Sequence, residues 1–146
     1  MKMAEAIGAH PNCKYVLFLG DGCSDISELS ERFCDRIFYS VKGNNDFSSA
    51  EPFTREINLL GHRLFMTHGH MYNVKYGLSS ILQAARERGA DIALFGHTHE
   101  RYLNYDSDSG IYLFNPGAVG AGYFGNSSYG VLTISQRDIL LSFGEL

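Results

Sequence analysis

Apolar runs of strand length recur along this chain, and several of them end in polar, glycine-containing loops. Uninterrupted apolar runs are typical of strands that are covered on both faces. The front half alternates these runs with helical patterns, whereas after residue 100 short strands and turns follow one another directly. The pattern predicts strands at 15–19, 36–41, 55–59, 63–67, 92–95, 101–105, 111–114, 129–135 and 139–143.

Helical patterns lie at the start of the chain, after the first strand and near the middle. The spacing of apolar residues predicts helices over 1–8, over 25–33 and over 77–88. Asp25 and Glu28 have the spacing of a capping box, and Gly89 is placed to end the third helix. This order of elements predicts mixed sheets packed face to face, with helices outside.

Composition and charge narrow the class of protein. At 146 residues and 45% apolar content, the chain is expected to form a single domain over 1–146. A net charge of -4 without any cluster of Lys or Arg argues against a nucleic-acid backbone or an anionic membrane as a partner. There is no 18-residue apolar span, and the three cysteines lack the spacing of a metal or disulfide framework. A reducing, cytoplasmic location is therefore expected.

Four of the six histidines form two His-x-His units, each directly after an apolar run. The first unit is His68 and His70, and the second is His97 and His99. In an extended segment, residues i and i+2 project to the same side, so each pair can converge on one point. A single exposed unit of this kind is usually a pair of solvated loop histidines, but two units at strand ends favour a metal site.

Reading only the ends of the predicted strands adds Asp21 and Asn44 to the residues His68, His97 and His99. A carboxylate can bridge two cations, an amide supplies a neutral oxygen, and imidazoles complete the ligand shells. Two such metals can hold the attacking and leaving oxygens of a displacement at phosphorus, and lower the pKa of bound water toward ~7. The expected nucleophile is then a metal-bound hydroxide, with no serine or cysteine required.

Taken in order, the motifs of this chain resemble those of the calcineurin-like metallophosphoesterases, and within them the YfcE-type phosphodiesterases. Each motif is weak alone, whereas the ordered set is specific. The resemblance implies an α/β fold, a four-layer αββα sandwich of two mixed β-sheets flanked by helices, and a site for two divalent metals. Manganese is the first expectation, with iron, nickel or zinc as alternatives. The motifs are Gly20-Asp21, Gly43-Asn44-Asn45-Asp46, Thr67-His68-Gly69-His70, Gly96-His97-Thr98-His99-Glu100 and Asn115-Pro116-Gly117.

The resemblance also implies a role for each candidate ligand. Asp21 would bridge the two metals. Asn44, His68 and His97 would bind one of them, and His99 would bind the other.

One departure from the family concerns proton transfer. Where the larger family has a His after the ligand Asn, a residue thought to protonate the leaving group, this chain has Asn45. An amide cannot donate a proton to a leaving group at neutral pH, so His70 is the candidate general acid. The alternative is that His70 only forms hydrogen bonds near the site.

A second departure concerns the first strand. Family members open with a strand carrying Asp-x-His, which supplies two ligands to the metal that His99 helps to hold, and no such strand is present here. It would lie in the middle of a sheet. Losing about four buried apolar residues at ~1.5–3 kcal/mol each rivals the stability of a typical domain. Three explanations stay open: an N-terminal truncation relative to the family, a gap filled by repacking or by a neighbouring subunit, and loss of one metal.

The sequence thus predicts a metal-dependent phosphoesterase, in particular a phosphodiesterase, acting on a small phosphoester. One alternative is a non-catalytic scaffold on the same fold, as in the retromer subunit that shares it. Another is a metal-dependent hydrolase of C–N or C–O bonds with a convergent histidine site. The retained ligand candidates favour catalysis, whereas the missing Asp-x-His favours the scaffold. Whether the protein forms a homo-oligomer stays open.

Overall fold

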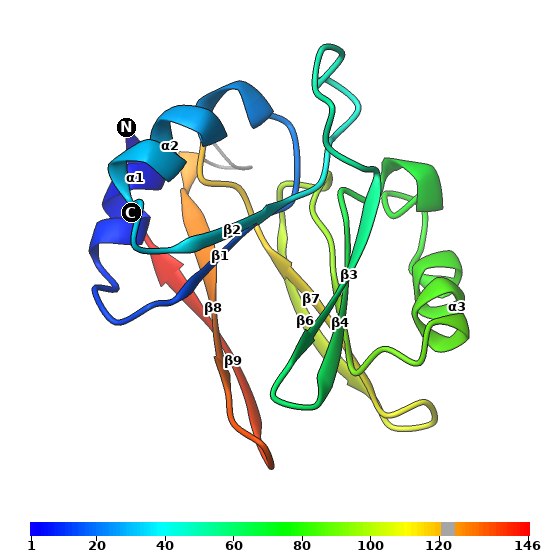
Figure 1. The fold of residues 1–146 in the computed structure, drawn as a ribbon. Helices are drawn as coiled ribbons and strands as arrows, with labels where there is room; N and C mark the ends of the chain where they lie inside the picture. The colour runs from blue at the N-terminus through cyan, green and yellow to red at the C-terminus, as the bar shows by residue number, and fades with distance from the viewer. Residues whose placement is uncertain (121–124) are drawn as a thin grey trace.

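Two β layers lie face to face between helices in the computed structural model, which describes residues 1–120 and 125–146 (Figure 1). The first layer is a five-stranded sheet in the order β3-β4-β5-β7-β6. Its three central strands are parallel, and the two edge strands are antiparallel to their neighbours. The strands are β3 (Thr54–Leu59), β4 (His62–Thr67), β5 (Ile92–Leu94), β6 (Arg101–Asp106) and β7 (Ile111–Pro116).

Helix α3 (Ser79–Glu87) covers the outer face of this sheet (Figure 1). Its apolar stripe, which includes the fully buried Ile81 and Ala85, packs against Phe65 and Phe95. The helix ends before Gly89, whose φ of 62° lies in the left-handed region that suits glycine after a helix. The predicted position of Gly89 at the end of this helix is therefore confirmed.

The second layer consists of two separate pairs of strands. β1 (Tyr15–Phe18) runs parallel to β2 (Ile37–Ser40), and β8 (Ser128–Ile134) runs antiparallel to β9 (Ile139–Glu145). Helices α1 (Lys2–Gly8) and α2 (Ile26–Arg32) lie outside this layer (Figure 1). The inner faces of the two layers share one apolar core, to which both pairs of the second layer contribute. Its members include Leu17, Tyr39, Leu64, Met66, Ile92, Leu94, Phe114, Leu132 and Leu141.

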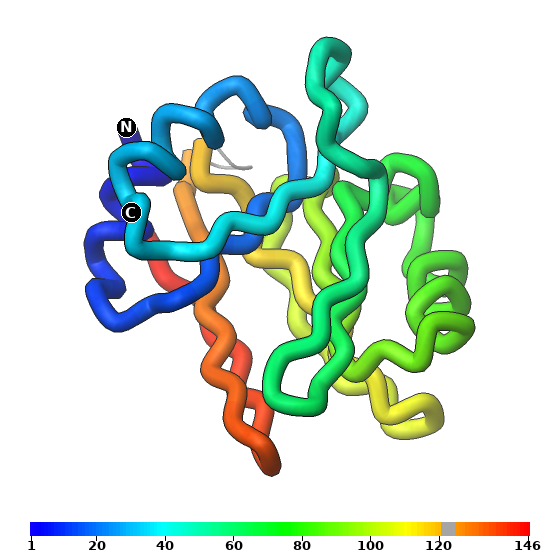
Figure 2. The backbone as a smooth tube through the Cα atoms, in the orientation of Figure 1, coloured from blue at the N-terminus to red at the C-terminus, as the bar shows by residue number. Residues whose placement is uncertain are grey.

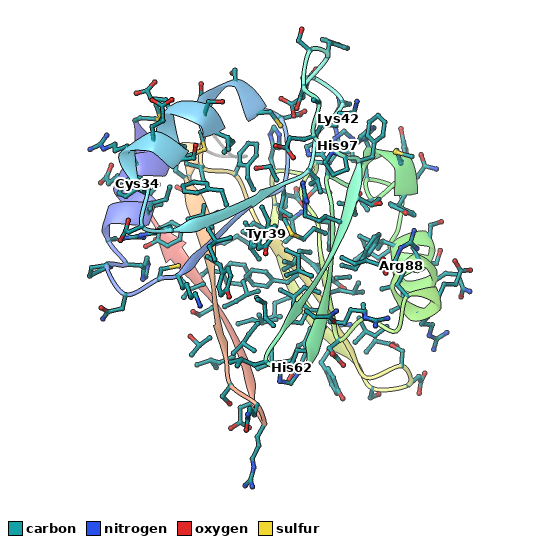
Figure 3. The ribbon with its side chains drawn as sticks, viewed as in Figure 1. Cys34, Tyr39, Lys42, His62, Arg88 and His97 are labelled. Atoms are coloured by element: carbon teal, nitrogen blue, oxygen red, sulfur yellow. The ribbon has the colours of Figure 1, made fainter. Side chains whose placement is uncertain are left out.

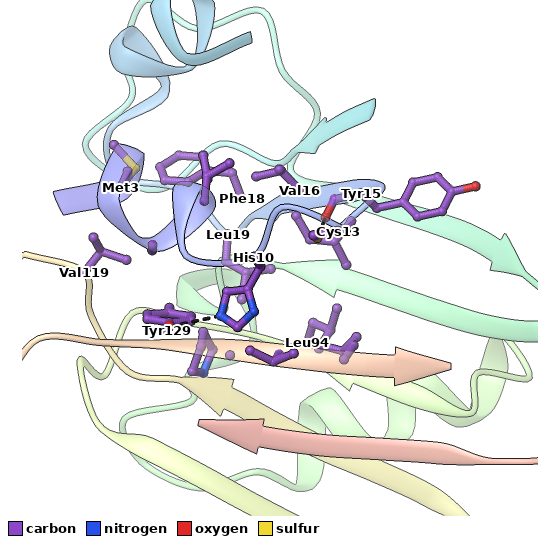
Figure 4. Close-up of a pocket in the computed structure, with 18 of the residues that line it drawn as sticks. Met3, His10, Cys13, Tyr15, Val16, Phe18, Leu19, Leu94, Val119 and Tyr129 are labelled. Atoms are coloured by element: carbon purple, nitrogen blue, oxygen red, sulfur yellow. Dashed lines mark hydrogen bonds between the residues drawn. The ribbon is translucent and has the colours of Figure 1, made fainter. Parts of the chain in front are cut away.

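A gap separates the two pairs of the second layer. Within the described residues, β1 pairs in a sheet only with β2, and β8 only with β9. A cavity of about 1550 Å³ lies between them and is lined by residues of α1, β1 and β8. Figure 2 traces the backbone of both pairs, and Figure 4 shows some of the side chains that line the cavity. The only labelled bridge in that view is a hydrogen bond of 3.0 Å between His10 Nε2 and the Tyr129 hydroxyl.

The predicted fold class, an αββα sandwich with its first strand missing, is confirmed: helices flank two β layers, and one layer is interrupted. One local prediction is wrong. Asp25 does precede α2, but its side chain makes no capping hydrogen bond, because its backbone is already helical at φ -85° and ψ -15°. It belongs to a short 3-10 turn, Cys23–Asp25, that runs into the helix. In the described part of the chain, no helix has the length and apolar character needed to cross a membrane.

Candidate metal centre

The two His-x-His units lie side by side at the carboxyl ends of the parallel strands β4 and β5. The Gly96 backbone N–H donates a 2.9 Å hydrogen bond to the His68 carbonyl oxygen, which joins the two loops. The rings of His68 and His97 meet edge to face, with their centres 5.0 Å apart. Figure 3 shows His97 at the upper end of the sandwich, whereas His62, at the start of β4, lies at the lower end.

Asp21, which follows β1, meets His68 and His97 at this edge. The His68 Nε2 atom lies 3.1 Å from His97 Nδ1 and 3.4 Å from Asp21 Oδ2. The other ring nitrogen of His68 lies 2.7 Å from the Leu19 carbonyl oxygen. Because a carbonyl oxygen only accepts, the proton of a neutral His68 is on Nδ1 and its lone pair is on Nε2. That lone pair points at His97 and Asp21, as in histidines that are oriented by a backbone carbonyl to bind a metal.

The electrostatics of this Asp21–His68–His97 cluster favour neutral imidazoles. Burial of the ring, followed by the charges of His68 and Lys75, lowers the pKa of His97 to about 4, and the Asp21 carboxylate only partly opposes the shift. His97 is therefore neutral at neutral pH and keeps a lone pair. Burial, followed by His68, also lowers the pKa of His70.

Asn45 donates hydrogen bonds to both oxygens of the Asp21 carboxylate. The Asn45 backbone N–H donates to Oδ1 and the side-chain Nδ2 donates to Oδ2, each at 2.9 Å. Glycines allow the loops after β1 and β2 to approach this closely. A Cβ atom at Gly43 would overlap Asp21 Oδ1, and one at Gly20 would lie 2.6 Å from the Gly43 nitrogen.

Asp46 ties the same two loops together through the backbone. Its Oδ2 accepts N–H bonds from Asp21 (2.6 Å) and Gly43 (2.7 Å), and its Oδ1 accepts from Gly22 (2.8 Å) and Cys23 (3.0 Å). Burial acts to raise the pKa of Asp46, but the N–H bonds from Gly43, Gly22 and Cys23 outweigh it and hold the pKa well below its usual range. Burial also raises the pKa of the Cys23 thiol to about 11, so the thiol stays protonated beside this carboxylate.

Sequence reasoning did not identify the residues that support the candidate ligands. Asn115, fully buried at the end of β7, donates from Nδ2 to the Gly96 carbonyl oxygen (3.1 Å) and to Thr98 Oγ1 (2.9 Å). It thereby fixes the loop that carries His97. Asp46 and Asn115 do stand in two of the motifs that carry the family resemblance, Gly43-Asn44-Asn45-Asp46 and Asn115-Pro116-Gly117, but sequence reasoning assigned neither residue a role.

The other predicted residues lie around the cluster. Asn44 is exposed in the loop that Asp46 anchors, and the exposed His99 lines the same cavity as the three clustered residues. The His70 ring lies 5.5 Å from the His68 ring, centre to centre, and its Nδ1 is buried without a hydrogen-bond partner. Across residues 1–120 and 125–146, no three His, Cys, Asp or Glu side chains are arranged as a complete ion site. The structure thus brings three predicted ligands into contact and leaves Asn44 and His99 beside them.

Three of the five predicted ligands have left-handed backbones, with φ values of 59° at Asp21, 68° at His97 and 60° at His99. Residues other than glycine rarely adopt this conformation, which costs about 1–3 kcal/mol each and is found mostly at functional sites. Leu60 and Asn73 share this conformation, while the other three strained non-glycine residues among those described are ones that chemistry selected independently. This coincidence supports a functional role for the edge.

By type, the donors of the cluster suit a divalent transition metal, although in the described residues they are not arranged as a complete ion site. Two neutral imidazole nitrogens and a carboxylate oxygen converge, and one of the imidazoles is held in the correct tautomer by a backbone carbonyl. The unpartnered Nδ1 of His70 is a further polar atom next to the cluster. The cavity between β1 and β8 opens onto these residues, since Asp21, His68, His97 and His99 are among those that line it.

Comparisons with known proteins agree with this chemistry. The model of the family described as "Calcineurin-like phosphoesterase superfamily domain" matches residues 1–137 of this chain. The probable metallophosphoesterase YsnB of Bacillus subtilis is 34% identical over 125 residues, which cover 83% of this chain and 71% of YsnB. Phosphodiesterase YfcE of Escherichia coli K12 is 34% identical over 111 residues, which cover 69% of this chain and 53% of YfcE. The chain thus spans about half the length of YfcE.

Among solved structures, a Zn²⁺ complex of Vps29 from Entamoeba histolytica has the same fold, with a TM-score of 0.79 over 99% of this chain and 89% of that one. Its sequence identity is 18%, so the likeness concerns the fold alone.

Proposed function

Because this chain belongs to the calcineurin-like phosphoesterase superfamily, we propose that it is a metal-dependent phosphoesterase that hydrolyses small phosphodiesters. The observation that carries the proposal is the position of His68, which contacts both Asp21 and His97 at the ends of three strands. A phosphodiester is the favoured substrate because a relative that shares 34% of aligned residues is named a phosphodiesterase. The 53% coverage of that relative leaves its activity a proposal for this chain.

In the proposed site, Asp21, His68 and His97 hold a divalent cation, with Asn44 and His99 completing the ligand set for a pair. Oxygen and imidazole donors suit manganese, iron, nickel or zinc, and manganese is our first candidate because the resemblance to the family leans to it. The oriented Nε2 of His68 and the neutral ring of His97 supply lone pairs without prior loss of a proton at neutral pH.

Bound divalent metals supply a water of lowered pKa and positive charge against the phosphoryl oxygens. The protein's own residues position these partners. His70 lies beside the cluster with an unpartnered Nδ1, where it can donate a hydrogen bond to, or hold a proton for, the leaving oxygen. An anionic phosphoester next to its ring would favour the protonated form, against the effect of burial. Asn45, whose amide hydrogens point at Asp21, does not take that role.

A non-catalytic scaffold is the second candidate function, and the gap between β1 and β8 favours it. Besides the bridging Asp21, only His99 of the predicted ligands would bind the second metal, and both residues line the cavity. A relative from another functional class, Vps29 of Schizosaccharomyces pombe, is named a vacuolar protein sorting-associated protein and is 39% identical over 79 residues.

Metal content and turnover separate the two candidates. The protein is loaded with Mn²⁺, its bound metal is counted, and hydrolysis of a bis-aryl phosphodiester is followed. We expect metal-dependent turnover that falls by at least about 100-fold in Asp21→Ala, since a ligand is lost. The matched control is Asp35→Ala, at an exposed position away from the site. Bound metal without turnover would favour the scaffold, and absence of bound metal would refute the proposed site.

A further inference from the structure

The loop after β2 contains an arrangement that the candidate ligands alone do not explain. Asn45 donates one hydrogen bond from its backbone and one from its side chain to the two oxygens of a single carboxylate, that of Asp21. Both bonds are 2.9 Å long. A two-point contact of this kind fixes the rotation of the carboxylate as well as its position.

We propose that Asn45 is a positioning residue, which holds the Asp21 carboxylate in the orientation that binds a divalent cation. The inference rests on the proposed function. Each carboxylate oxygen has two lone pairs, so each can accept from Asn45 and still offer one to a cation. Oδ2, the oxygen that accepts from the Asn45 amide, is also the one that lies 3.4 Å from His68 Nε2.

Asn45 can orient Asp21 only if the two loops that carry these residues are fixed relative to each other, and Asp46 fixes them. Asp46 binds the backbone N–H of Asp21 and of Gly43, so the loop that carries Asn45 and the loop that carries Asp21 are fixed to the same carboxylate. The Asp46 N–H also donates to the Gly43 carbonyl oxygen at 3.3 Å, closing a turn around Asn45. Asn45 is itself exposed, so these bonds, and not burial, hold it in place.

Three other roles for Asn45 can be separated from this one: a proton donor, a residue that only stabilises the loop, and a competitor of the cation. Asn45 cannot act as the proton donor to a leaving group, because an amide does not ionise at neutral pH. If it only stabilised the loop, removing its side chain would change the free energy of unfolding without metal and leave metal affinity unchanged. If its amide instead competed with the cation for Asp21 Oδ2, removing it would strengthen metal binding.

The test is calorimetric titration of the metal-free protein with Mn²⁺ alone, together with urea unfolding in a chelator. In Asn45→Ala the backbone N–H bond remains and the side-chain bond is lost, so we expect Mn²⁺ affinity to fall about 10- to 100-fold. Unfolding without metal should change little, since the side chain is exposed. Asn45→Gln, which keeps the amide on a longer stem, should recover part of the affinity.

Asn104→Ala is the matched control, because Asn104 is exposed on β6 and touches none of these loops. Unchanged or tighter Mn²⁺ binding by Asn45→Ala, next to a wild type that binds, overturns this inference alone. A wild type that does not bind Mn²⁺ overturns the proposed metal site together with it.

Discussion

Backbone strain at single residues gathers at this edge: of the five non-glycine residues with positive φ in the described part of the chain, three are Asp21, His97 and His99. His99 is exposed yet left-handed, so its side chain contributes little packing that would offset the strain. We predict that His99→Gly is more stable than His99→Ala by about 1 kcal/mol, because glycine relieves the steric clash and alanine keeps it. Urea unfolding without metal measures the difference.

The control is a position with ordinary helical backbone, where the glycine variant should be less stable than the alanine variant. Arg86 is exposed in α3, where glycine costs about 1 kcal/mol relative to alanine. Arg86→Gly should therefore be less stable than Arg86→Ala. A ranking at residue 99 that matches the one at residue 86 would show that the left-handed backbone at His99 is not strained.

Asp46 is the residue on which the two loops depend most. Asp46→Asn replaces one of two acceptor oxygens with a donor, so at least two backbone N–H groups lose their partner. We predict a loss of about 2–3 kcal/mol in the free energy of unfolding at neutral pH. Asp35→Asn, at an exposed position, should have no measurable effect.

The sign of the pH dependence follows from the lowered pKa of Asp46. Its folded pKa lies below the unfolded one, so its stabilising contribution is complete above about pH 4 and is lost as the pH falls further. The difference in stability between wild type and Asp46→Asn should therefore shrink as the pH is lowered from about 5 toward 2. A difference that stayed constant over this range would contradict the assigned hydrogen bonds.

At the scale of elements, the pattern of apolar residues was sufficient to place the strands and hence the ends of the strands. Because parallel strands end at one edge, His68 and His97 could be predicted to meet although 29 positions separate them. The error at Asp25 has a local cause. A capping side chain requires an extended backbone at the cap, and the sequence does not reveal the 3-10 turn that makes Asp25 helical.

The bonds between loops could not be predicted in the same way. Asp46 and Asn115 accept and donate across contacts that join different strands, and nothing in their local sequence specifies the partner. The positive φ values of Asp21, His97 and His99 could not be predicted either, because Asp and His adopt the left-handed region only occasionally and the sequence carries no glycine at these positions. The candidate ligands could therefore be predicted from residue type and position, whereas the residues that orient them became apparent only in the folded structure.

At the scale of the whole molecule, the decisive feature is the interrupted second layer. Leu132 of β8 belongs to the shared core but also lines the cavity between β1 and β8, so a larger side chain there has space to enter. We predict that Leu132→Phe raises the free energy of unfolding by about 0.5–2 kcal/mol, as substitutions that fill cavities commonly do. Binding of the dye ANS to the native protein should fall in parallel, because apolar surface in the cavity becomes covered.

The matched control is the same substitution in the closed part of the same core. Leu64 of β4 is completely buried, so Leu64→Phe must displace neighbours and should destabilise by about 1–3 kcal/mol. Opposite signs for the two variants would establish that the shared core is closed around Leu64 and open at Leu132. If Leu132→Phe were as destabilising as Leu64→Phe, the cavity would not exist in solution. The strands β1 and β8 would then have closed on each other, and the edge that carries Asp21 would need a new description.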